Sequence, residues 1–566
     1  MVKAHKKENQ KEITKKCTVC LTVATITCNN CNSVHYCSKE HQKEHLKAHK
    51  NDCKLYVIRT NSILGRYIVT GRDIKQGETI LKDTPIVIGP PIEASPLCLN
   101  CYKPISPSKK PFCCPKCQIA PLCSSMCSAT GHNKIECEKF RTSTALTAET
   151  LLQHCQIIAP LRCLFLRESD PDTWKELMKM ESHLEKRRDT PIWRNHKSNV
   201  EEVLASFGLV SKDDVKNEVV QKICGILDVN TFELRIPEFE LGPSVNIREC
   251  VRGVYLQAAL MAHDCIGNTH LAVDDNFNLT VHASVPIKKG TPIYFNYTNA
   301  LQGTYDRQDH LKEGKYFKCS CKRCRSSTDC GTHLSSLVCI KCHRGMVAPL
   351  KLTENIHRYE SVWKCLDKKC SYIYRGNMIG TAITQSKNII EDADKTDIRT
   401  VESLIKKLLI TFSPNHYIIL DLKQWLIGLH SEILRRDPNP SRKIISSKLQ
   451  LCKEILPVLE TVEPGISRLR GITYYEMHIP MVVLANREYD SGEISAEELL
   501  KRMLESEDVL KKAISCLLYE PSASPEGRLA ARALHELKLL RKSVSSVEQI
   551  VENKKEAIDK RRRKKK

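Results

Sequence analysis

The sequence predicts an α+β protein made of several units, and three observations support that prediction. Cysteine and histidine recur at metal-ligand spacings as far as Cys370. Short β-rich runs joined by Gly-containing turns lie between and after these arrays. Beyond residue 376 the apolar residues follow a helical period. The 566 residues also exceed a typical domain of about 150 residues several times over.

Composition excludes several classes of protein. With 41% hydrophobic residues the chain can bury a core of ordinary size, so disorder is not expected as a general rule. No apolar run approaches the roughly 18 residues that a membrane span requires, and the opening residues carry charge without a hydrophobic stretch behind it. We therefore expect an unsecreted protein with no membrane partner.

The net charge of +22 is concentrated at the two ends of the chain. The last seven residues, 560–566, are all basic, and the opening segment is rich in lysine. The middle therefore need not be a phosphate-binding surface. It also lacks interleaved basic and aromatic platforms, so nucleic acid is not expected as the main ligand. The basic tail is either a nuclear address or a solvated segment.

The 29 cysteines favour metal binding over disulfides, because a reducing compartment keeps them as thiols. Eight ligands within residues 17–53 would fill two tetrahedral zinc sites, and zinc would supply folding energy that so short a segment cannot obtain from burial. The usual interleaving of such arrays predicts two sets of ligands. These are Cys17, Cys20, Cys37 and His41 for one ion, and Cys28, Cys31, His49 and Cys53 for the other.

A second array of eight ligands follows with different loop lengths. Cys113 competes with Cys114 for one position, and the CxxC spacing favours Cys114. The spacing between the last two ligands is one residue longer than in the first array, which leaves the identity of the last ligand undecided. The eight positions are Cys98, Cys101, Cys114, Cys117, Cys123, Cys127, His132 and Cys137.

Helices with charged faces are expected after the second array, over residues 141–226. Short β-rich runs lie on both sides of them. GRYIVT begins at Gly65, and the alternating run LTVHASVPI covers residues 279–287, a pattern typical of a half-buried strand. The cysteine motif CxCxxC follows at residues 319–324.

The order of these motifs is specific. GRYIVTGRDIKQGE (65–78), a zinc array, a helical stretch, HDCxxN (263–268), YFNY (294–297) and CxCxxC (319–324) follow one another. In this order they resemble the SMYD family, SET-domain lysine methyltransferases with an inserted MYND zinc finger. The additional leading array resembles the arthropod branch. Both arrays then resemble MYND fingers, modules that bind protein segments, although a purely structural clip stays an equal alternative for the second.

The resemblance implies a post-SET zinc site. Cys265 would join Cys319, Cys321 and Cys324 as the fourth thiolate of one ion. That assignment explains a cysteine that is otherwise isolated among apolar residues.

The resemblance also implies S-adenosyl-L-methionine as the cofactor. Gly65 and Arg66 fall at the loop that contacts its methionine end, Asn230 fits the family's Asn position near the same ligand, and His263 would present its backbone and ring. Ala262 departs from the family, which has an asparagine there. An alanine can neither donate nor accept the hydrogen bonds of that side chain at the cofactor.

Methyl transfer to lysine requires little acid–base machinery. The target amine, with a pKa near ~10.4, must arrive deprotonated and in line with the sulfonium methyl. An aromatic channel lowers that pKa by desolvation, and a phenol hydroxyl aligns the amine. The resemblance assigns this role to Tyr297 and makes Tyr316 a second channel tyrosine. Both are alternatively core aromatics at a sheet edge.

Four further cysteines suit one structural zinc in a ribbon-like segment. They are Cys339, Cys342, Cys365 and Cys370.

The C-terminal part is predicted to be all-α. Breakers at Pro414, 438–440, Pro464, Ser491-Gly492 and 521–525 divide it into helical hairpins. Their spacing suggests a tetratricopeptide-like array, although no repeat signature is present. Such a stack would offer a concave face to a partner or cover the substrate channel.

The motifs divide the chain into ten segments, named here from the N-terminus. They are a basic arm (1–16), a MYND-type finger (17–53), the N-terminal part of SET (54–97), a second MYND-like finger (98–137), a helical insert (138–226), the SET core (227–310), the post-SET site (311–325), the ribbon-like segment (330–376), the helical domain (377–550) and a basic tail (551–566).

These inferences predict a protein-lysine N-methyltransferase that uses S-adenosylmethionine and zinc. Its substrate would be a protein with a target lysine, histone or non-histone, and partner peptides would bind the fingers. We expect it in the nucleus and cytoplasm, with roles in chromatin and transcription. The alternative is a catalytically weak SET/MYND adaptor, which Ala262 favours, whereas Tyr297, Tyr316 and His263 favour the enzyme.

Overall fold

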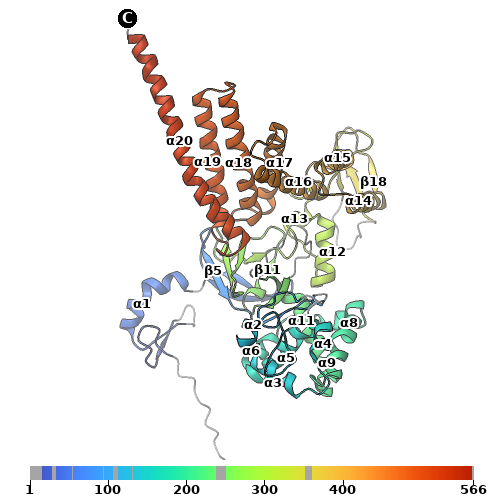
Figure 1. Cartoon of the computed structure of the whole chain (residues 1–566). Coiled ribbons are helices and arrows are strands. Elements are labelled where there is room, and N and C mark those ends of the chain that lie inside the picture. Colours follow the sequence, from blue (N-terminus) through green and yellow to red (C-terminus); the bar gives the residue numbers. More distant parts are fainter. Residues whose placement is uncertain are drawn as a thin grey trace, which may run out of the picture.

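The structure is a computed structural model that describes residues 16–28, 34–53, 55–92, 95–105, 112–130, 132–236, 250–350 and 360–563. Figure 1 shows a β-rich centre with the helical insert on one side and a stack of long helices on the other, while the first finger stands apart. This architecture confirms the predicted α+β class. The predicted ligand Cys31 and nearly all of the basic arm lie outside the described residues.

The first finger is a small unit with little apolar burial. Its core cluster consists of Cys17, Cys28 and Tyr36, two of which are predicted zinc ligands. Ser38 caps its helix by accepting a hydrogen bond from the His41 backbone N–H at 3.3 Å. So small a core gives the unit little stability without metal. The elements are β1 (Ile26–Thr27), β2 (His35–Tyr36) and α1 (Lys39–Asp52).

The SET core is built from short strands that come from distant parts of the chain. One antiparallel sheet has the order β12-β13-β5, another has the order β6-β10-β9, and a hairpin joins β3 to β4. The predicted alternation is seen in β13, where Leu279, Val281 and Ala283 enter the core. The strands are β3 (Tyr56–Asn61), β4 (Gly65–Thr70), β5 (Thr79–Asp83), β6 (Val87–Gly89), β9 (Thr231–Arg235), β10 (Cys250–Val254), β11 (Ala262–His263), β12 (Thr269–Val273), β13 (Leu279–Ala283) and β14 (Tyr294–Phe295).

The second finger and the helical insert share one hydrophobic core. Cys98 and Cys114 of the finger lie in the same buried cluster as Leu161 and Ile223 of the insert. The second finger is therefore part of the SET unit. The elements are β7 (Phe112–Cys113), β8 (Pro121–Leu122), α2 (Ser125–Thr130), α3 (Lys134–Thr142), α4 (Ala148–Gln153), α5 (Ile158–Ser169), α6 (Pro171–Leu177), α7 (Leu184–Arg187), α8 (Pro191–His196), α9 (Glu202–Ser206), α10 (Lys212–Lys216) and α11 (Val219–Asn230).

Arg162 of α5 fixes this junction. Its guanidinium donates to the Glu136 carboxylate at 2.7 Å, to the backbone oxygen of Leu99 at 3.1 Å and to the Tyr102 hydroxyl at 2.9 Å. Glu136 is fully buried and also accepts from His132 Nδ1 at 2.7 Å. One arginine thus ties the finger to the insert through a carboxylate that orients a predicted zinc ligand.

After the SET core the chain forms a ribbon that packs on the C-terminal helices. The four-stranded antiparallel sheet has the order β15-β16-β17-β18, and Trp363 of this sheet lies in the same core cluster as Phe412 beyond it. The ribbon therefore continues into the helical domain. The elements are α12 (Thr304–Lys315), α13 (Lys322–Arg325), β15 (Leu337–Val338), β16 (Met346–Pro349), β17 (Val362–Cys365) and β18 (Ile373–Arg375).

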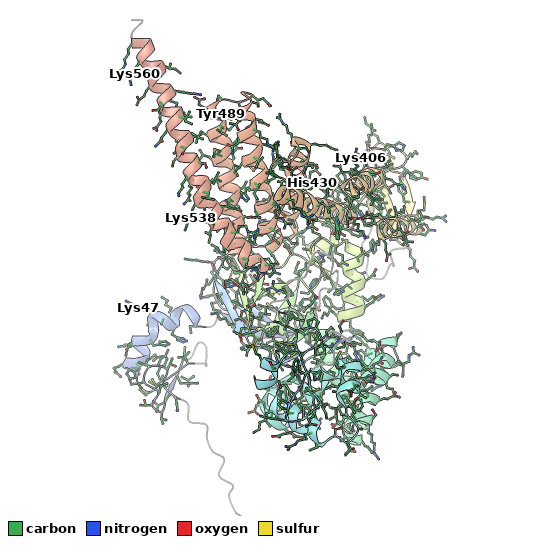
Figure 2. All side chains as sticks on the ribbon, in the orientation of Figure 1. Lys47, Lys406, His430, Tyr489, Lys538 and Lys560 are labelled. Carbon is green, nitrogen blue, oxygen red and sulfur yellow. The ribbon has the colours of Figure 1, made fainter. Side chains whose placement is uncertain are left out.

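The C-terminal part is all-α, and each predicted breaker falls at the junction of two helices, with Pro525 as the first residue of the last helix. The last helix continues to Arg563, so most of the predicted basic tail is helical, and Lys538 and Lys560 mark its course in Figure 2. No helix in the described ranges is both long and apolar enough to cross a bilayer. The helices are α14 (Gly376–Glu391), α15 (Ile398–Leu408), α16 (Tyr417–Arg436), α17 (Arg442–Val462), α18 (Arg468–Asp490), α19 (Ala496–Leu517) and α20 (Pro525–Arg563).

A partly buried polar contact joins the helical stack to the SET core. Arg468, at the start of α18, pairs with Glu520 at 2.8 Å and donates to the backbone oxygen of Leu271 at 3.2 Å. His270 of β12 lies 3.1 Å from the same Glu520 carboxylate. The Ile466 backbone N–H also donates to the carbonyl of Ser284 at 2.9 Å. The stack is thereby held against the β12 and β13 side of the core.

Substitution of Arg162 should loosen the second finger. In Arg162→Met the Glu136 carboxylate stays buried without its guanidinium partner, a change that costs about 3–5 kcal/mol. We expect faster amide hydrogen exchange in peptides spanning residues 98–140.

Arg167→Met on the same helix is the matched control, because its pair with Asp214 is partly exposed and contributes about 0–1 kcal/mol. Equal exchange in the two variants would contradict the proposed role of Arg162.

Candidate active site

A large cleft opens where the SET core, the insert and the helical stack meet. It has a volume of about 2180 Å³ and is lined by the start of β4, residues 179–183, the end of α11, β11 and the end of α12. The loop between α17 and α18 closes another side. All six residues predicted for the cofactor and the reaction line this cleft, and they are Gly65, Arg66, Asn230, His263, Tyr297 and Tyr316.

The base of the cleft is a crossing of two backbone segments. Ala262 and His263 pair in parallel with Tyr294 and Phe295. Asn268 then fastens the crossing, because its Nδ2 donates to the carbonyl of Pro292 at 2.9 Å and its Oδ1 accepts from the Tyr294 N–H at 2.7 Å. The crossing brings the HDCxxN and YFNY motifs together, and the sequence assigned no role to this asparagine.

Tyr297 lies directly after the crossing. Its hydroxyl donates to the carbonyl of Met261, and its ring packs against those of His263 and Phe295, with centroids 5.1 and 6.1 Å away. Burial raises the pKa of the phenol, so Tyr297 is a neutral hydroxyl over the physiological range. The structure thus provides a fixed phenol at the cleft.

His263 connects Tyr297 to the predicted post-SET zinc site. Its Nδ1 accepts from the Tyr297 backbone N–H at 3.0 Å, and its Nε2 lies 3.4 Å from Cys265 Sγ. Desolvation lowers the pKa of the ring to about 4, and a neutral ring can accept at Nδ1. The sequence predicted that this ring faces the cofactor, whereas both nitrogens contact the protein. Hydrogen bonds from His263 to a ligand in the cleft would therefore come from its backbone, and the predicted contact of the ring stays a prediction.

Gly65, Arg66 and Asn230 form one wall of the cleft with residues 179–183 of the insert. Gly65 has a φ of +65°, and no atom lies within 4 Å of where a Cβ would stand, so this end of β4 is open. Arg66 donates to the carbonyl of Lys179 at 3.2 Å, and Asn230 Nδ2 donates to that of Glu181 at 2.8 Å. The side-chain amide of Asn230 therefore faces the cleft with its oxygen.

Tyr316 lines the same cleft and contacts the insert. It follows α12 with a φ of +61°, and its ring lies 4.8 Å from that of His183. Arg187 approaches its hydroxyl at 3.5 Å, a long contact. Tyr297 and Tyr316 thus share the cleft, Tyr297 beside the ring of His263 and Tyr316 beside that of His183.

Four thiols meet beside the crossing at the predicted post-SET site. The Sγ atom of Cys265 lies 3.4 Å from that of Cys324 and 4.0 Å from that of Cys319, and Cys321 completes the group within 4.8 Å. Arg307 points its guanidinium at Cys324 Sγ from 3.8 Å. Four thiolates at these separations suit one tetrahedral zinc ion, whose negative complex a buried arginine stabilises.

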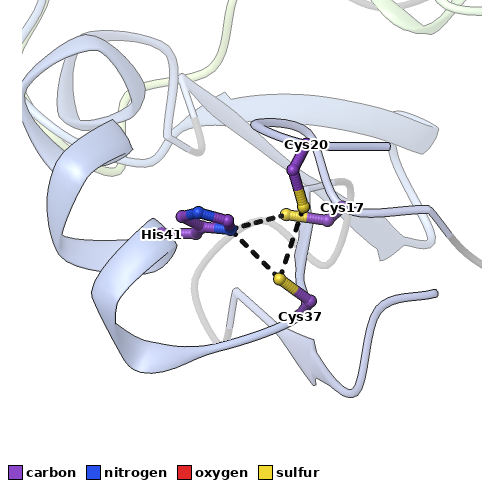
Figure 3. A group of neighbouring side chains, drawn as sticks. All are labelled: Cys17, Cys20, Cys37 and His41. Atoms are coloured by element: carbon purple, nitrogen blue, oxygen red, sulfur yellow. Dashed lines mark hydrogen bonds between the residues drawn. The ribbon is translucent and has the colours of Figure 1, made fainter. Parts of the chain in front are cut away.

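The first finger has one described quartet, and Figure 3 shows it. Cys17, Cys20, Cys37 and His41 face one another, with His41 Nδ1 3.0 Å from Cys37 Sγ and 3.7 Å from Cys17 Sγ. In the second predicted set Cys28 and Cys53 approach to 3.5 Å, while Cys31 lies outside the described residues.

Three more quartets lie in the second finger and the ribbon, each within 4.8 Å. Cys114, and not Cys113, belongs to one of them, and the last position of the array, Cys137, lies 3.8 Å from Cys114. The geometry therefore favours Cys114 over Cys113 and supports Cys137 as the last ligand of the array. The quartets are Cys98, Cys101, Cys123 and Cys127; Cys114, Cys117, His132 and Cys137; and Cys339, Cys342, Cys365 and Cys370.

Family models match two regions of the chain. Residues 17–53 match the MYND finger, and residues 65–298 match the SET domain. The chain therefore contains a MYND finger and a SET domain, and with the crossing, the cleft and the post-SET quartet it is similar to SET and MYND domain proteins of the SMYD type. The second array lies inside the SET match, so its assignment as a MYND-like finger stays a prediction.

Relatives of known name agree with this family. The chain is 25% identical to SET domain-containing protein SmydA-8, isoform A, of Drosophila melanogaster, over 74% of this chain and 87% of the relative. It is 22% identical to the histone-lysine N-methyltransferase ASHR1 of Arabidopsis thaliana, over 83% and 96%. It is 26% identical to the N-lysine methyltransferase SMYD2-B of Danio rerio, over 38% and 48%. At the level of the family, these matches support methyltransferase activity.

Several residues at the site were not predicted from the sequence. Asn268 belongs to a motif that we recognised, so its place in HDCxxN was the available signal. Lys315 and Asp228 belong to no motif, and they reach the cleft only because α12 and α11 meet there. Residues 179–183 carry no signal in a single sequence either.

The quartets predict the metal content of the purified protein. We expect about six zinc ions, two for each finger array, one at the post-SET site and one in the ribbon, by metal analysis. Cys321→Ser should release one ion and weaken cofactor retention, because that quartet adjoins the crossing.

Cys113→Ser is a control, because Cys113 belongs to none of the quartets above, and it should leave the zinc content unchanged. Three or fewer ions in the parent, or an unchanged count in Cys321→Ser, would contradict the ligand assignment.

Proposed function

We propose that the chain is a protein-lysine N-methyltransferase that uses S-adenosylmethionine. The observation that carries this proposal is the Tyr297 phenol, fixed by the Met261 carbonyl and the His263 ring in a deep cleft of a SET-family chain. The relatives named as lysine methyltransferases support it.

The residues at the cleft fit the proposed cofactor. When bound, S-adenosylmethionine would supply a methyl group activated by its sulfonium. The wall formed by Gly65, Arg66 and Asn230 offers an open backbone, a cation and an amide oxygen, which are complementary to a zwitterionic amino-acid end. The backbone of His263 lies in the crossing itself, where it pairs with Phe295.

The reaction would depend on positioning and desolvation of the target lysine. Burial by Tyr297 and Phe295 would lower the pKa of a target lysine, because charged ammonium is disfavoured in an apolar site. The neutral Tyr297 hydroxyl would align the amine lone pair, and the proton leaves for solvent before transfer. The carbonyl of Met261 fixes that hydroxyl, so its orientation is set before the substrate arrives.

A second function, the SET/MYND adaptor, is supported by Ala262. Ala262 lines the cleft, and its methyl group cannot replace the hydrogen bonds that the family's asparagine makes at the cofactor. In that case the first finger, which stands apart from the core, would bind a partner peptide and the SET unit would be a scaffold.

Other features of the function are proposals as well. The first finger is the better candidate for peptide binding, because the second shares the core of the insert. The basic end of α20 suits a nuclear address, and we place the protein in both nucleus and cytoplasm, with chromatin and transcription as its setting.

Cofactor binding separates the two functions. We expect weak but measurable binding of S-adenosylmethionine by calorimetry, since losing one contact at Ala262 costs about 1–3 kcal/mol and lowers affinity by roughly ten- to a hundredfold. Tyr297→Phe should leave this binding nearly intact and reduce methyl transfer to a lysine-peptide array strongly, because the hydroxyl acts on the amine in the transition state.

Tyr372→Phe in the ribbon is the matched control and should behave as the parent. No cofactor binding at millimolar concentration would refute the enzyme. Binding without turnover, with Tyr297→Phe equal to the parent, would favour the adaptor.

A further inference from the structure

Around the end of α11, the side chains at the wall of the cleft carry more positive than negative charge. The Asp228 carboxylate accepts from Arg187 at 2.7 Å, from His196 at 2.7 Å and from Arg252 at 3.2 Å. Burial alone would raise the pKa of Asp228, but the hydrogen bond from His196 and the two guanidiniums lower it to about 2. Asp228 is therefore ionised, and its single charge is already shared by two arginines.

Lys315 adds another cation to this wall. It is the last residue of α12, and its Nζ donates to the carbonyl of Val229 at 2.6 Å and to that of Asp228 at 3.3 Å. The same Nζ lies 5.9 Å from the centre of the Tyr297 ring. Lys315 thus reaches the part of the cleft where Tyr297 sits.

The ammonium of Lys315 lacks a counter-ion. Among the described residues it makes no ion pair, and its hydrogen bonds go to two backbone carbonyls. Burial lowers its pKa to about 8, with the charge of Asp228 opposing the shift. The nearby carboxylate of Glu181 is mostly exposed and accepts from the backbone N–H groups of Ser182 and His183. A partly buried cation without a carboxylate partner is an expected contact for an anionic ligand group.

On this basis, and resting on the proposed function, we propose that Lys315 binds the α-carboxylate of S-adenosylmethionine. The cofactor carries a sulfonium, an ammonium and one anionic group, the carboxylate. Lys315, Arg187 and Arg252 repel the two cationic groups, as they would the ammonium of a target lysine. The carboxylate is therefore the group that complements this wall. Lys315 matches none of the family motifs, and its charge offsets part of the affinity lost at Ala262.

The test pairs a change in the protein with a change in the ligand. Calorimetry compares S-adenosylmethionine with its decarboxylated form, which lacks only the carboxylate, in the parent, Lys315→Met, Lys315→Arg and Lys312→Met. Lys312→Met removes an exposed charge from the same helix and is the matched control. Circular dichroism and zinc content verify that each variant is folded.

We expect the parent and Lys312→Met to prefer the complete cofactor by about 10- to 100-fold. In Lys315→Met that preference should fall to within about threefold, through weaker binding of S-adenosylmethionine, while the decarboxylated form binds as before. Lys315→Arg keeps the charge and should keep most of the preference.

Three results would overturn the inference while the parent still binds cofactor. Lys315→Met could weaken both ligands equally, which indicates a structural role. It could leave the preference intact, which places the carboxylate elsewhere. Mass spectrometry after turnover could find a methyl group on Lys315, which makes it an acceptor. If the parent binds neither ligand, the proposed function fails and this inference fails with it.

Discussion

The site depends on the crossing of residues 262–268 with residues 292–297. These segments are joined by a short parallel pairing, by the two side-chain hydrogen bonds of Asn268 and by the hydrogen bonds of Tyr297 to Met261 and His263, which together hold the HDCxxN and YFNY motifs against each other. Tyr297 follows the crossing and packs against the buried cluster that contains Cys265 of the post-SET quartet. Because His263 contacts both, the metal site and the phenol are parts of one rigid arrangement. The walls of the cleft are then added by the insert and by α12.

Local patterns in the sequence predicted the elements well. The alternation in 279–287 identified β13, and the predicted breakers marked the junctions of the C-terminal helices, although Pro457 and Pro480 lie inside helices. The place of Cys265 in the post-SET quartet was implied by the family resemblance. Contacts between distant elements could not be predicted in this way. Arg162 looks like any arginine of an amphipathic helix, and only the folded chain shows that it reaches Glu136. The contacts of Lys315 could not be predicted for the same reason. The contacts of the two His263 ring nitrogens could not be predicted either, because a motif does not show where those nitrogens point.

The two fingers solve the same folding problem differently. Both are too small to be stabilised by burial alone, so metal ligands take the place of a core. The first has only a small cluster of its own and stands apart from the SET unit. The second adds its cysteines to the core of the insert and is fastened by Arg162. A free module can reorient toward a partner, whereas a fused one transmits its stability to the wall of the cleft.

The long insertion between β5 and β13 also sets an order of events during synthesis. Thr79 and His282, which contact each other across these strands, are 203 residues apart in the chain. At a translation rate of roughly 5–20 residues per second, β5 leaves the ribosome about 10–40 s before its partner strand exists. During that interval the apolar residues Ile80 and Leu81 have no sheet to join, while the first finger can already bind metal and close. The nascent chain is therefore most exposed to aggregation and to chaperones while the insert is being made.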